Sequence, residues 1–359
     1  MLSLAITGIV YLMSFAVILA SVLPIVVNPH WAFRVFDFPR LQITCAAIIS
    51  LAGLAVIIVC QSDAIFALSL AALLSIITVY QCWWIFPYTK LHKKHVKNSR
   101  NHGAGVGIKL IAANVLQTNT EYEKLLEVIH DNDPDIIVTL ESDSTWEKAL
   151  KPRLQNYPHC IAVPQDNLYG MHVFSRLPLL NSKVLYRVKD DIPSITADIS
   201  VADDMPPIHL YFIHPMPPSP TEADESTSRD QELILVAREI DDAQAYIVAG
   251  DLNDVAWSRT TRLFRKLSGL LDPRIGRGFF NTFHAHWRLL RWPLDHVFVS
   301  RHFTVDQVQR LPDIGSDHFP IMLAVSYHNK YVNDTSEETQ EGASDMEQAV
   351  LDDRMNETK

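Results

Sequence analysis

The sequence is poor in cysteine, and its four cysteines are unevenly distributed. Cys45, Cys60 and Cys82 fall in long apolar segments near the N-terminus, whereas Cys160 is the single cysteine of the remaining chain. A disulfide within the polar part of the chain is therefore excluded. The distribution is compatible with either side of a membrane, so it leaves the redox compartment open.

Charge is nearly absent from the first 89 residues, where only Arg34, Asp37, Arg40 and Asp63 carry a full charge. A helix needs about 20 apolar residues to cross the apolar core of a bilayer. Three uncharged apolar runs reach that length, namely Leu4–Val27, Leu41–Cys60 and Ala64–Pro87. Residues 1–89 are therefore predicted to be a membrane domain with three transmembrane helices.

The first run does not resemble a cleaved signal peptide, because it lacks a basic leading segment and two further spans follow it. Three spans put the N-terminus and the polar region on opposite sides of the membrane. Arg34, Arg40 and the five Lys and Arg of residues 90–107 then share the side of the polar region. The positive-inside rule makes that side cytoplasmic, although a long folded domain can be translocated despite such charges.

The polar region also lacks an excess of basic residues. The formal charge of −10 divides into 0 for residues 1–89, +5 for residues 90–107, −8 for residues 108–330 and −7 for residues 331–359. A duplex DNA-binding surface needs Lys and Arg to neutralise phosphates, so nucleic acid is not the favoured partner. We interpret residues 90–107 as a basic linker and residues 331–359 as an acidic, disordered tail without an apolar face.

Residues 108–330 alternate between strand-like and helix-like patterns, which indicates one α/β domain. Helices are predicted at Thr120–His130, opened by a capping box at Thr120 and Glu123, and at Arg229–Ile240. The predicted strands are Ile108–Ala113, Asp135–Leu140, Met171–Ser175, Ile192–Val201, Ile208–Ile213, Ala245–Ala249, His296–Val299 and Ile321–Val325.

Polar side chains follow the apolar strands at the points where sites form in open α/β sheets. Each has an ordinary structural explanation when taken alone: a Gly-Asp-x-Asn segment such as residues 250–253 is usually a turn. An Asp-His pair such as Asp295-His296 is more often structural than catalytic. The candidates in chain order are Asn114, Glu141, His214, Asp251, Asn253, Asp295, Asp317 and His318.

The order and spacing of these residues are more specific than any single motif. The stretches that carry them read IAANVL, DIIVTLE, IHP, VAGDLND, PLDHVF and GSDHFPI. Together they resemble the endonuclease/exonuclease/phosphatase superfamily, which has the deoxyribonuclease I-like fold. The stretch GMHVFSRLPL is similar to that family's strand ending in Ser-Arg, here Ser175 and Arg176. The resemblance implies a two-sheet β-sandwich flanked by helices over residues 108–327.

The resemblance implies hydrolysis of phosphate esters with Mg²⁺ or Mn²⁺ as cofactor. Hard cations prefer oxygen ligands, and Glu141 is the primary candidate ligand, with Asn114 and Asp317 beside it. His318 can act as a base near neutral pH, and by resemblance Asp295 holds its imidazole in one tautomer.

Other members of the set are expected to position water and phosphate. By resemblance Asp251 positions the attacking water or contacts the metal, Asn253 donates to a phosphate oxygen, and His214 binds the phosphate or assists the leaving oxygen. Asp251 and Asn253 are two apart, so on an extended segment both face the same way. Arg176, Arg274 and Arg277 are the candidate substrate-binding residues, although the last two fit an ordinary surface loop equally well.

The favoured function is a membrane-anchored, metal-dependent phosphoesterase acting on a phosphorylated lipid or envelope substrate. The alternatives are a membrane-tethered nuclease and an inactive scaffold. The arrangement resembles bacterial membrane-bound members of the superfamily, including glycopeptide-resistance-type proteins. That resemblance implies a multi-pass protein of the cell (inner) membrane with its catalytic domain on the outer face, against the charge argument. The substrate, the type of ester, the metal and the oligomeric state are open.

Overall fold

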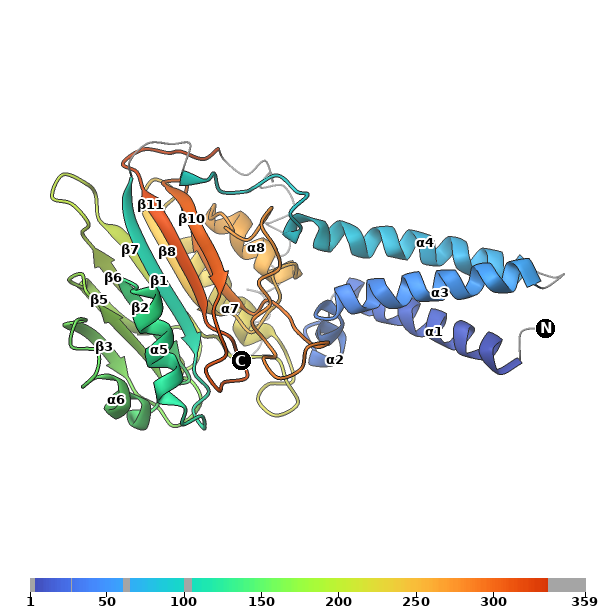
Figure 1. Cartoon of the computed structure of the whole chain (residues 1–359), viewed down its shortest axis with the longest axis horizontal. Coiled ribbons are helices and arrows are strands. Elements are labelled where there is room, and N and C mark those ends of the chain that lie inside the picture. The colour runs from blue at the N-terminus through green and yellow to red at the C-terminus, as the bar shows by residue number, and fades with distance from the viewer. Residues whose placement is uncertain (1–3, 27, 61–64, 100–104, 335–359) are drawn as a thin grey trace, which may run out of the picture.

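The computed structural model describes residues 4–26, 28–60, 65–99 and 105–334. Figure 1 shows three long helices projecting from one side of a strand-rich domain. The segments Leu4–Ile25, Arg40–Cys60 and Ile65–Tyr88 are long and apolar enough to cross a membrane. The three predicted spans are therefore confirmed as helices, within one or two residues at most ends. This part of the chain consists of α1 (Leu4–Val22), η1 (Leu23–Ile25), α2 (Trp31–Arg34), η2 (Val35–Asp37), α3 (Arg40–Cys60), α4 (Ile65–Ile85) and η3 (Phe86–Tyr88).

The three long helices bury one narrow stripe each and leave most apolar side chains outside. Val17, Ala47, Leu54 and Leu74 form their shared core. Side chains on their other faces are exposed, as Val59 is at 84%. In water such exposure would be costly, whereas hydrocarbon accepts it, so the surface of the bundle fits a lipid environment.

Eleven strands form two sheets in the described residues. The six-stranded sheet has the order β10-β11-β1-β2-β4-β3, and the five-stranded sheet has the order β5-β6-β7-β8-β9. The strands of the first sheet are β1 (Val106–Asn114), β2 (Ile136–Leu140), β3 (His159–Val163), β4 (Met171–Ser175), β10 (Phe303–Arg310) and β11 (Ile321–Tyr327). The strands of the second are β5 (Leu180–Tyr186), β6 (Pro193–Ile199), β7 (Ile208–Phe212), β8 (Ala245–Asp251) and β9 (Asp295–Val299).

The two sheets pack face to face and helices cover their outer faces. Side chains such as Leu110 and Val138 of the first sheet meet Leu210 and Ile247 of the second in one core. Helices α5 (Tyr122–Asn132) and α6 (Ser144–Leu150) pack on the outside of the first sheet, and α7 (Thr227–Glu239) and α8 (Arg259–Ser268) on the outside of the second. The predicted fold class, a two-sheet sandwich flanked by helices, is confirmed.

The start of α5 differs from the prediction. The helix begins at Tyr122, its N-cap is Glu121, and no side chain caps it. Instead, the side-chain oxygen of Asn119 accepts a hydrogen bond from the backbone N–H of Glu121 at 2.9 Å. The predicted capping box at Thr120 is therefore wrong, because the turn before the helix is closed by an asparagine one position earlier.

The first loop between the long helices lies against the sandwich. The guanidinium of Arg34 donates to Thr260 at 2.8 Å and lies 3.5 Å from the carboxylate of Asp230. The indole N–H of Trp257 donates to the carbonyl of Asp37 at 2.7 Å. These buried polar contacts fix the orientation of the domain relative to the helices, because breaking any of them would strand a buried group without a partner.

The basic linker and the start of the acidic tail also pack on the sandwich. Val96 is fully buried, and the backbone N–H of Val305 donates to Lys97 at 2.9 Å. Asn333 is only 5% exposed, and its side chain bonds the N–H of Lys97 and the carbonyl of Phe303. Residues 331–334 of the tail therefore pack on the sandwich, because Asn333 satisfies backbone groups of the linker and of β10. For the rest of the tail, disorder stays a prediction. Residues 335–359, like 100–104 of the linker, lie outside the described residues.

Truncation after Lys330 is expected to lower the melting temperature of the protein, whereas truncation after Asp334 leaves it nearly unchanged. The shorter chain loses the hydrogen bonds of Asn333 and the packing of the Tyr331 ring under Arg301, whose guanidinium carbon lies 3.9 Å from the ring centre. A loss of about 2 kcal/mol corresponds to roughly 4–8 °C for a domain of this size. Thermal unfolding of the two truncated chains measures the difference, and equal melting temperatures would contradict it.

Candidate active site

Four polar side chains from both sheets meet at one edge of the sandwich. Asn114 ends β1, Glu141 follows β2, Asp251 ends β8, and Asp295 begins the antiparallel neighbour β9 opposite Asp251. The side-chain nitrogen of Asn114 donates to Glu141 at 2.7 Å and to Asp251 at 3.2 Å. One asparagine therefore ties a carboxylate of the first sheet to a carboxylate of the second.

The backbone before Asp251 can be occupied only by glycine. Gly250 has a φ of +151°, and a Cβ at that position would lie 1.9 Å from the carbonyl oxygen of Ile213. A side chain there would push β8 away from the chain that leads to His214. Glycine at this position thus allows the ends of β7 and β8 to approach closely, which brings Asp251 toward the first sheet.

His318 lies between two carboxylates. Its Nδ1 is 2.8 Å from Asp295, and its Nε2 is 3.5 Å from Asp251. The hydroxyl of Ser316 accepts from the N–H of His318 at 3.1 Å and donates to the carbonyl of Asn114 at 2.8 Å. The imidazole is therefore held in one orientation by both its side chain and its backbone.

The buried setting shifts the protonation of the site. Burial alone would lower the pKa of His318, but Asp295 and Asp251 outweigh it and raise the pKa to about 10. Burial raises the pKa of Glu141 to about 7. Burial lowers the pKa of His214 to about 4, so this histidine is neutral at pH 7. The two histidines of the site thus differ: His318 is an imidazolium, and His214 is an uncharged donor or acceptor.

The donor set fits a divalent cation. Asp251, Asp295 and His318 offer ligand atoms within 4.8 Å of one another, and the Oδ1 atom of Asp295 has no hydrogen-bond partner among the described residues. Glu141 adds a further buried carboxylate, so negative charge exceeds the single imidazolium. Because Asp295 is hydrogen-bonded to His318 and Asp251 lies 3.5 Å from its other ring nitrogen, we regard Glu141 as the carboxylate best placed to hold a cation, with Asp317 at the rim. This set is compatible with Mg²⁺ or Mn²⁺.

Asn114 bridges the two carboxylates through its amide nitrogen. Its side-chain oxygen accepts from the N–H of Leu116 at 3.2 Å, while its nitrogen faces the carboxylates of Glu141 and Asp251. In this geometry Asn114 orients the two carboxylates, and the expectation that its oxygen ligates the cation stays a prediction.

His214 and Asn253 approach the site from the second sheet. The Nδ1 atom of His214 is buried without a hydrogen-bond partner among the described residues, and its ring lies 5.3 Å from that of Tyr169. Asn253 has a φ of +50°, and its amide donates to the carbonyl of Pro215 at 3.0 Å. The expectation that Asp251 and Asn253 face the same way on an extended segment is therefore wrong, because the chain turns directly after Asp251.

Two of the three candidate arginines form hydrogen bonds within the protein, and Arg274 is buried while Arg277 is half-buried. Arg274 is 1% exposed, pairs with Asp272 at 2.8 Å and donates to the ring of His296 and the carbonyl of Asp295. Arg277 donates to the carbonyls of Pro273 and Val96 and to Asn98 in the basic linker. Neither guanidinium is presented to a substrate, because each is bonded to several acceptors within the domain and the linker. Arg274 supports the strand of Asp295 from behind, and Arg277 anchors the linker.

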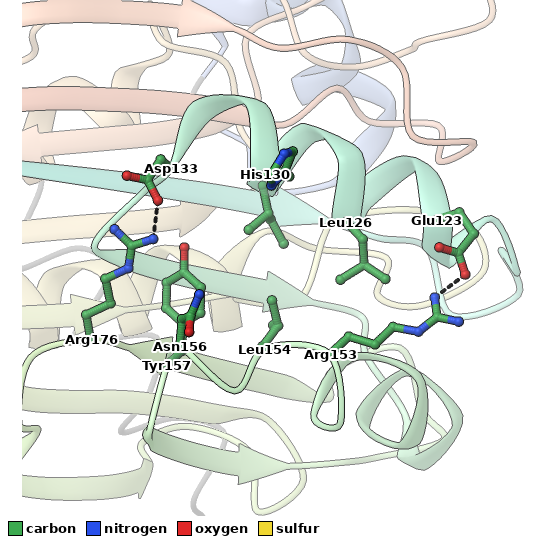
Figure 2. Close-up of a pocket in the computed structure, with 10 residues that line it drawn as sticks. Glu123, Leu126, His130, Asp133, Arg153, Leu154, Asn156, Tyr157 and Arg176 are labelled. Atoms are coloured by element: carbon green, nitrogen blue, oxygen red, sulfur yellow. Dashed lines mark hydrogen bonds and ion pairs between the residues drawn. The ribbon is translucent and has the colours of Figure 1, made fainter.

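The third arginine, Arg176, lies at the end of the strands opposite to the active site. Arg176 follows Ser175, which pairs with Ile136 at the start of β2, whereas Glu141 follows the end of β2. Five residues of strand separate the two positions by about 16 Å. Figure 2 shows Arg176 in a pocket beside α5, pointing toward Asp133. The two side chains form an ion pair. The prediction that Arg176 binds the substrate is therefore not supported by its position.

Several residues that support the site were not singled out from the sequence. Thr282 accepts from the N–H of Asp295 at 3.2 Å, and the ring of Phe283 lies 4.9 Å from the His318 ring. Arg229, buried in α7, donates to the carbonyl of Asn253 at 2.9 Å. Thr282 and Phe283 follow Arg277 by a few residues, but nothing in the sequence places them beside His318. Arg229 was interpreted only as the start of an amphipathic helix.

In the presence of a chelator, the stability of the protein is expected to fall as the pH rises from 7.5 to 9. A histidine whose pKa is raised in the folded state stabilises the fold fully below its unfolded value near 6.5, and this contribution is lost as the pH approaches the folded value of about 10. His318→Gln should lose most of this pH dependence. Melting temperatures of both proteins across this range test the expectation, and parallel curves would refute it.

Comparisons with known proteins agree with this geometry. A model of the endonuclease/exonuclease/phosphatase family matches residues 110–318. An endonuclease/exonuclease/phosphatase family protein from Bacteroides thetaiotaomicron is similar in structure, with a TM-score of 0.50, 18% identity and coverage of 63% of this chain and 99% of its own. D. rerio TDP2 complexed with a single-strand DNA product gives a TM-score of 0.50 at 17% identity, covering 61% of this chain and 99% of its own.

Among curated protein sequences there is no match. At these identities the solved structures show a shared fold and nothing about substrate. The family match spans more than half of the chain and includes every strand that carries the site, from Asn114 to His318. The chain therefore belongs to the endonuclease/exonuclease/phosphatase family.

Proposed function

We propose that the chain is a membrane-anchored phosphoesterase that depends on a divalent cation and hydrolyses a phosphate ester of a lipid or other envelope substrate. The observation that carries the proposal is the buried cluster of Glu141, Asp251, Asp295 and His318, bridged by Asn114. Buried carboxylates around one imidazolium are costly unless they bind a cation or act chemically. All the positions that the family motifs supply are filled, which disfavours an inactive scaffold.

Each residue of the cluster has a role in ester hydrolysis. Glu141 and Asp317 would hold Mg²⁺ or Mn²⁺, which when bound polarises the phosphate oxygens. Asp251 orients the attacking water and accepts its proton as the new P–O bond forms. His318 holds a phosphoryl oxygen with its Nε2–H, because its two carboxylate neighbours keep it protonated. This reverses the base assignment expected from the sequence. The bond from phosphorus to the ester oxygen breaks as the new bond forms, and the leaving oxygen takes a proton from solvent. His214, which is neutral, is placed to donate a hydrogen bond to the phosphate or to the leaving oxygen.

The charge of the domain favours a lipid or envelope ester over a nucleic acid. Residues 108–330 have a formal charge of −8, so the domain lacks the excess of Lys and Arg that a nucleic-acid groove needs. The three long helices, if they cross a membrane, keep the domain beside the headgroups. A membrane-tethered nuclease is the alternative, because the same residues can cleave a nucleic-acid phosphodiester.

A substrate panel tests the proposal. The full chain in lipid nanodiscs is given a lipid phosphomonoester, a lipid phosphodiester, a soluble aryl phosphate, single-stranded DNA and plasmid DNA, each with Mg²⁺, with Mn²⁺ and with chelator. Chelator-sensitive hydrolysis of a lipid ester supports the proposal. Faster cleavage of DNA than of any lipid would favour the membrane-tethered nuclease instead. If no activity is sensitive to chelator, the inactive scaffold is the remaining alternative.

We also propose that the domain lies on the outer face of the cell membrane. The support is the resemblance to envelope-acting relatives, and the opposing argument is charge. Arg34 and Arg40 are both close to Asp37, and Arg34 is close to Asp230, so these arginines have a structural use that is independent of topology. Paired reporters fused after Asp334 test it, one active only after export and one only in the cytoplasm. Activity of the cytoplasmic reporter alone would reverse the assignment.

A further inference from the structure

One loop next to the active site exposes several large apolar side chains. Residues 286–290 are all exposed, and among them Trp287 is 62% and Leu289 84% exposed. Elsewhere in the sandwich such large apolar side chains are mostly buried in the two cores. Adjacent exposed tryptophan and leucine side chains indicate a surface that has a partner.

The base of this loop touches the catalytic histidine. Phe283 pairs by backbone with His318, and their rings lie 4.9 Å apart. The N–H of Ala285 donates to the carbonyl of Asp317 at 2.6 Å. The base of the loop therefore lies directly beside His318 and Asp317, and its tip is only a few residues away along the chain.

The tip of the same loop contacts the first turn of a membrane helix. The side-chain amide of Gln42, in the first turn of α3, donates to the carbonyl of Leu289 at 2.6 Å. The ring of Phe38, just before α3, meets the ring of Trp292 edge-on at 5.7 Å. A segment bound to the first turn of a membrane-spanning helix lies at the boundary between water and lipid.

A second loop beside the site is joined to the same juxtamembrane segment. Residues 215–225 follow His214, and the carbonyl of Asp224 accepts from the N–H of Trp31 at 2.8 Å. The N–H of Ser226 donates to the carbonyl of Pro29 at 2.9 Å. Two loops that follow or adjoin catalytic positions therefore contact the segment from Pro29 to Gln42. Figure 1 shows α2, which belongs to this segment, beside the sandwich.

The surface around the ends of the membrane helices carries exposed basic side chains, together with the exposed acidic residues Glu222, Asp224 and Glu225 of the second loop. Arg288 is exposed within the loop tip. Lys90, Lys93 and Lys94 are exposed just beyond α4 and η3. Basic side chains beside exposed aromatic and aliphatic ones match an anionic headgroup layer, in which the apolar groups enter the acyl boundary and the basic groups meet phosphates.

We propose that residues 286–290 insert into the headgroup layer of the membrane that the chain's own helices cross, and that this contact places the mouth of the active site at an anionic lipid surface. Trp287 and Leu289 enter the acyl boundary, and Arg288 binds lipid phosphate. The delivery of a lipid ester to His318 along this loop rests on the proposed function. The insertion of the loop does not, because it follows from exposure, position and charge alone.

Depth measurements with a spin label test the insertion without using activity. The four native cysteines are replaced by alanine, and a nitroxide is attached at Leu289→Cys in the full chain, reconstituted in vesicles of phosphatidylcholine with phosphatidylglycerol. Oxygen concentrates in the bilayer and a charged nickel chelate in water. We expect a ratio of oxygen to nickel collision rates several times higher at position 289 than at Leu180→Cys, an exposed leucine on β5 far from the helices.

Two outcomes would overturn the insertion, and a third would overturn its dependence on anionic lipid. Equal ratios at the two positions would place the loop in water. Protection of the label from both reagents, with broadening by a second label, would show that another copy of the chain covers the loop. Equal depth in vesicles of phosphatidylcholine alone would remove the role of anionic lipid. A shallower position in the neutral vesicles is the result that supports it.

A second variant links the loop to turnover. The double change Trp287→Ser and Leu289→Ser should lower the ratio of lipid-ester to soluble-ester hydrolysis on the order of tenfold. The matched control is Leu180→Ser with Tyr186→Ser, an exposed leucine and aromatic on β5. An unchanged ratio would refute delivery by this loop. If the unaltered chain hydrolyses neither ester, the proposed function fails, while the label depth still decides whether the loop inserts.

Discussion

Glu141→Gln should abolish phosphoester hydrolysis while the fold remains intact. The change removes a charge but keeps nearly the same volume and the hydrogen bond with Asn114, which lies 2.7 Å from the carboxylate. A cation that loses one anionic ligand binds more weakly and stabilises the developing charge less. A loss of about 4 kcal/mol of transition-state stabilisation corresponds to roughly a thousandfold in rate.

The stability of the variant should move in the opposite direction. Burial raises the pKa of Glu141 to about 7, so in the absence of a cation the ionised side chain costs stability above that pH. Glutamine removes this cost. With chelator at pH 8, the melting temperature of the variant should therefore equal or exceed that of the unaltered protein.

Turnover, calorimetric Mg²⁺ binding and thermal unfolding together separate a lost ligand from a damaged fold. Glu127→Gln, an exposed glutamate on α5, is the matched control and should change none of the three. Near-normal turnover of Glu141→Gln in Mg²⁺ would show that this carboxylate does not hold the cation. A lowered melting temperature in chelator would show that its charge is needed for folding.

The sequence predicted the positions of the site well where strands set them. Asn114, Glu141 and Asp251 stand at the ends of apolar strands, and a strand's length and direction fix where its last side chain lies. The prediction failed for Asn253 because a left-handed residue after the strand turned the chain. It failed for Arg274 because the pairing with Asp272 and His296 depends on how a loop folds back, which local pattern does not reveal.

The contacts between the helices and the sandwich could not be predicted from the sequence either. Arg34 and Arg40 could be counted as charges but not paired, since Asp230 and Gln81 lie far away along the chain. The strand β5 was missed because its side chains are nearly all exposed and show no alternation. The apolar residues near position 289 stood out only once the structure showed that they are exposed. Contacts between residues far apart in the sequence and the exposure of side chains therefore decide what the sequence did not reveal.

His318→Ala should cost about three to four orders of magnitude in kcat/KM, and Asp295→Asn should cost less. The alanine variant removes the group that holds the phosphoryl oxygen. The asparagine variant leaves the ring but withdraws the carboxylate 2.8 Å from Nδ1, which orients the ring and keeps it charged. Once His318 is gone, Asp295 has nothing left to orient. The double variant should therefore be about as slow as His318→Ala alone, with strongly non-additive effects.

The pH profile separates this role from a merely structural one. Because Asp295 raises the pKa of His318, its replacement should move the alkaline loss of activity to lower pH. The pair His209 and Asp198, in contact at 2.6 Å between β6 and β7, provides the matched control: His209→Ala and Asp198→Asn should leave both rate and profile nearly unchanged. Additive losses at His318 and Asp295, with an unshifted profile in Asp295→Asn, would show that the two residues act independently. In that case Asp251, 3.5 Å from the other ring nitrogen, would be the carboxylate that sets the charge of His318.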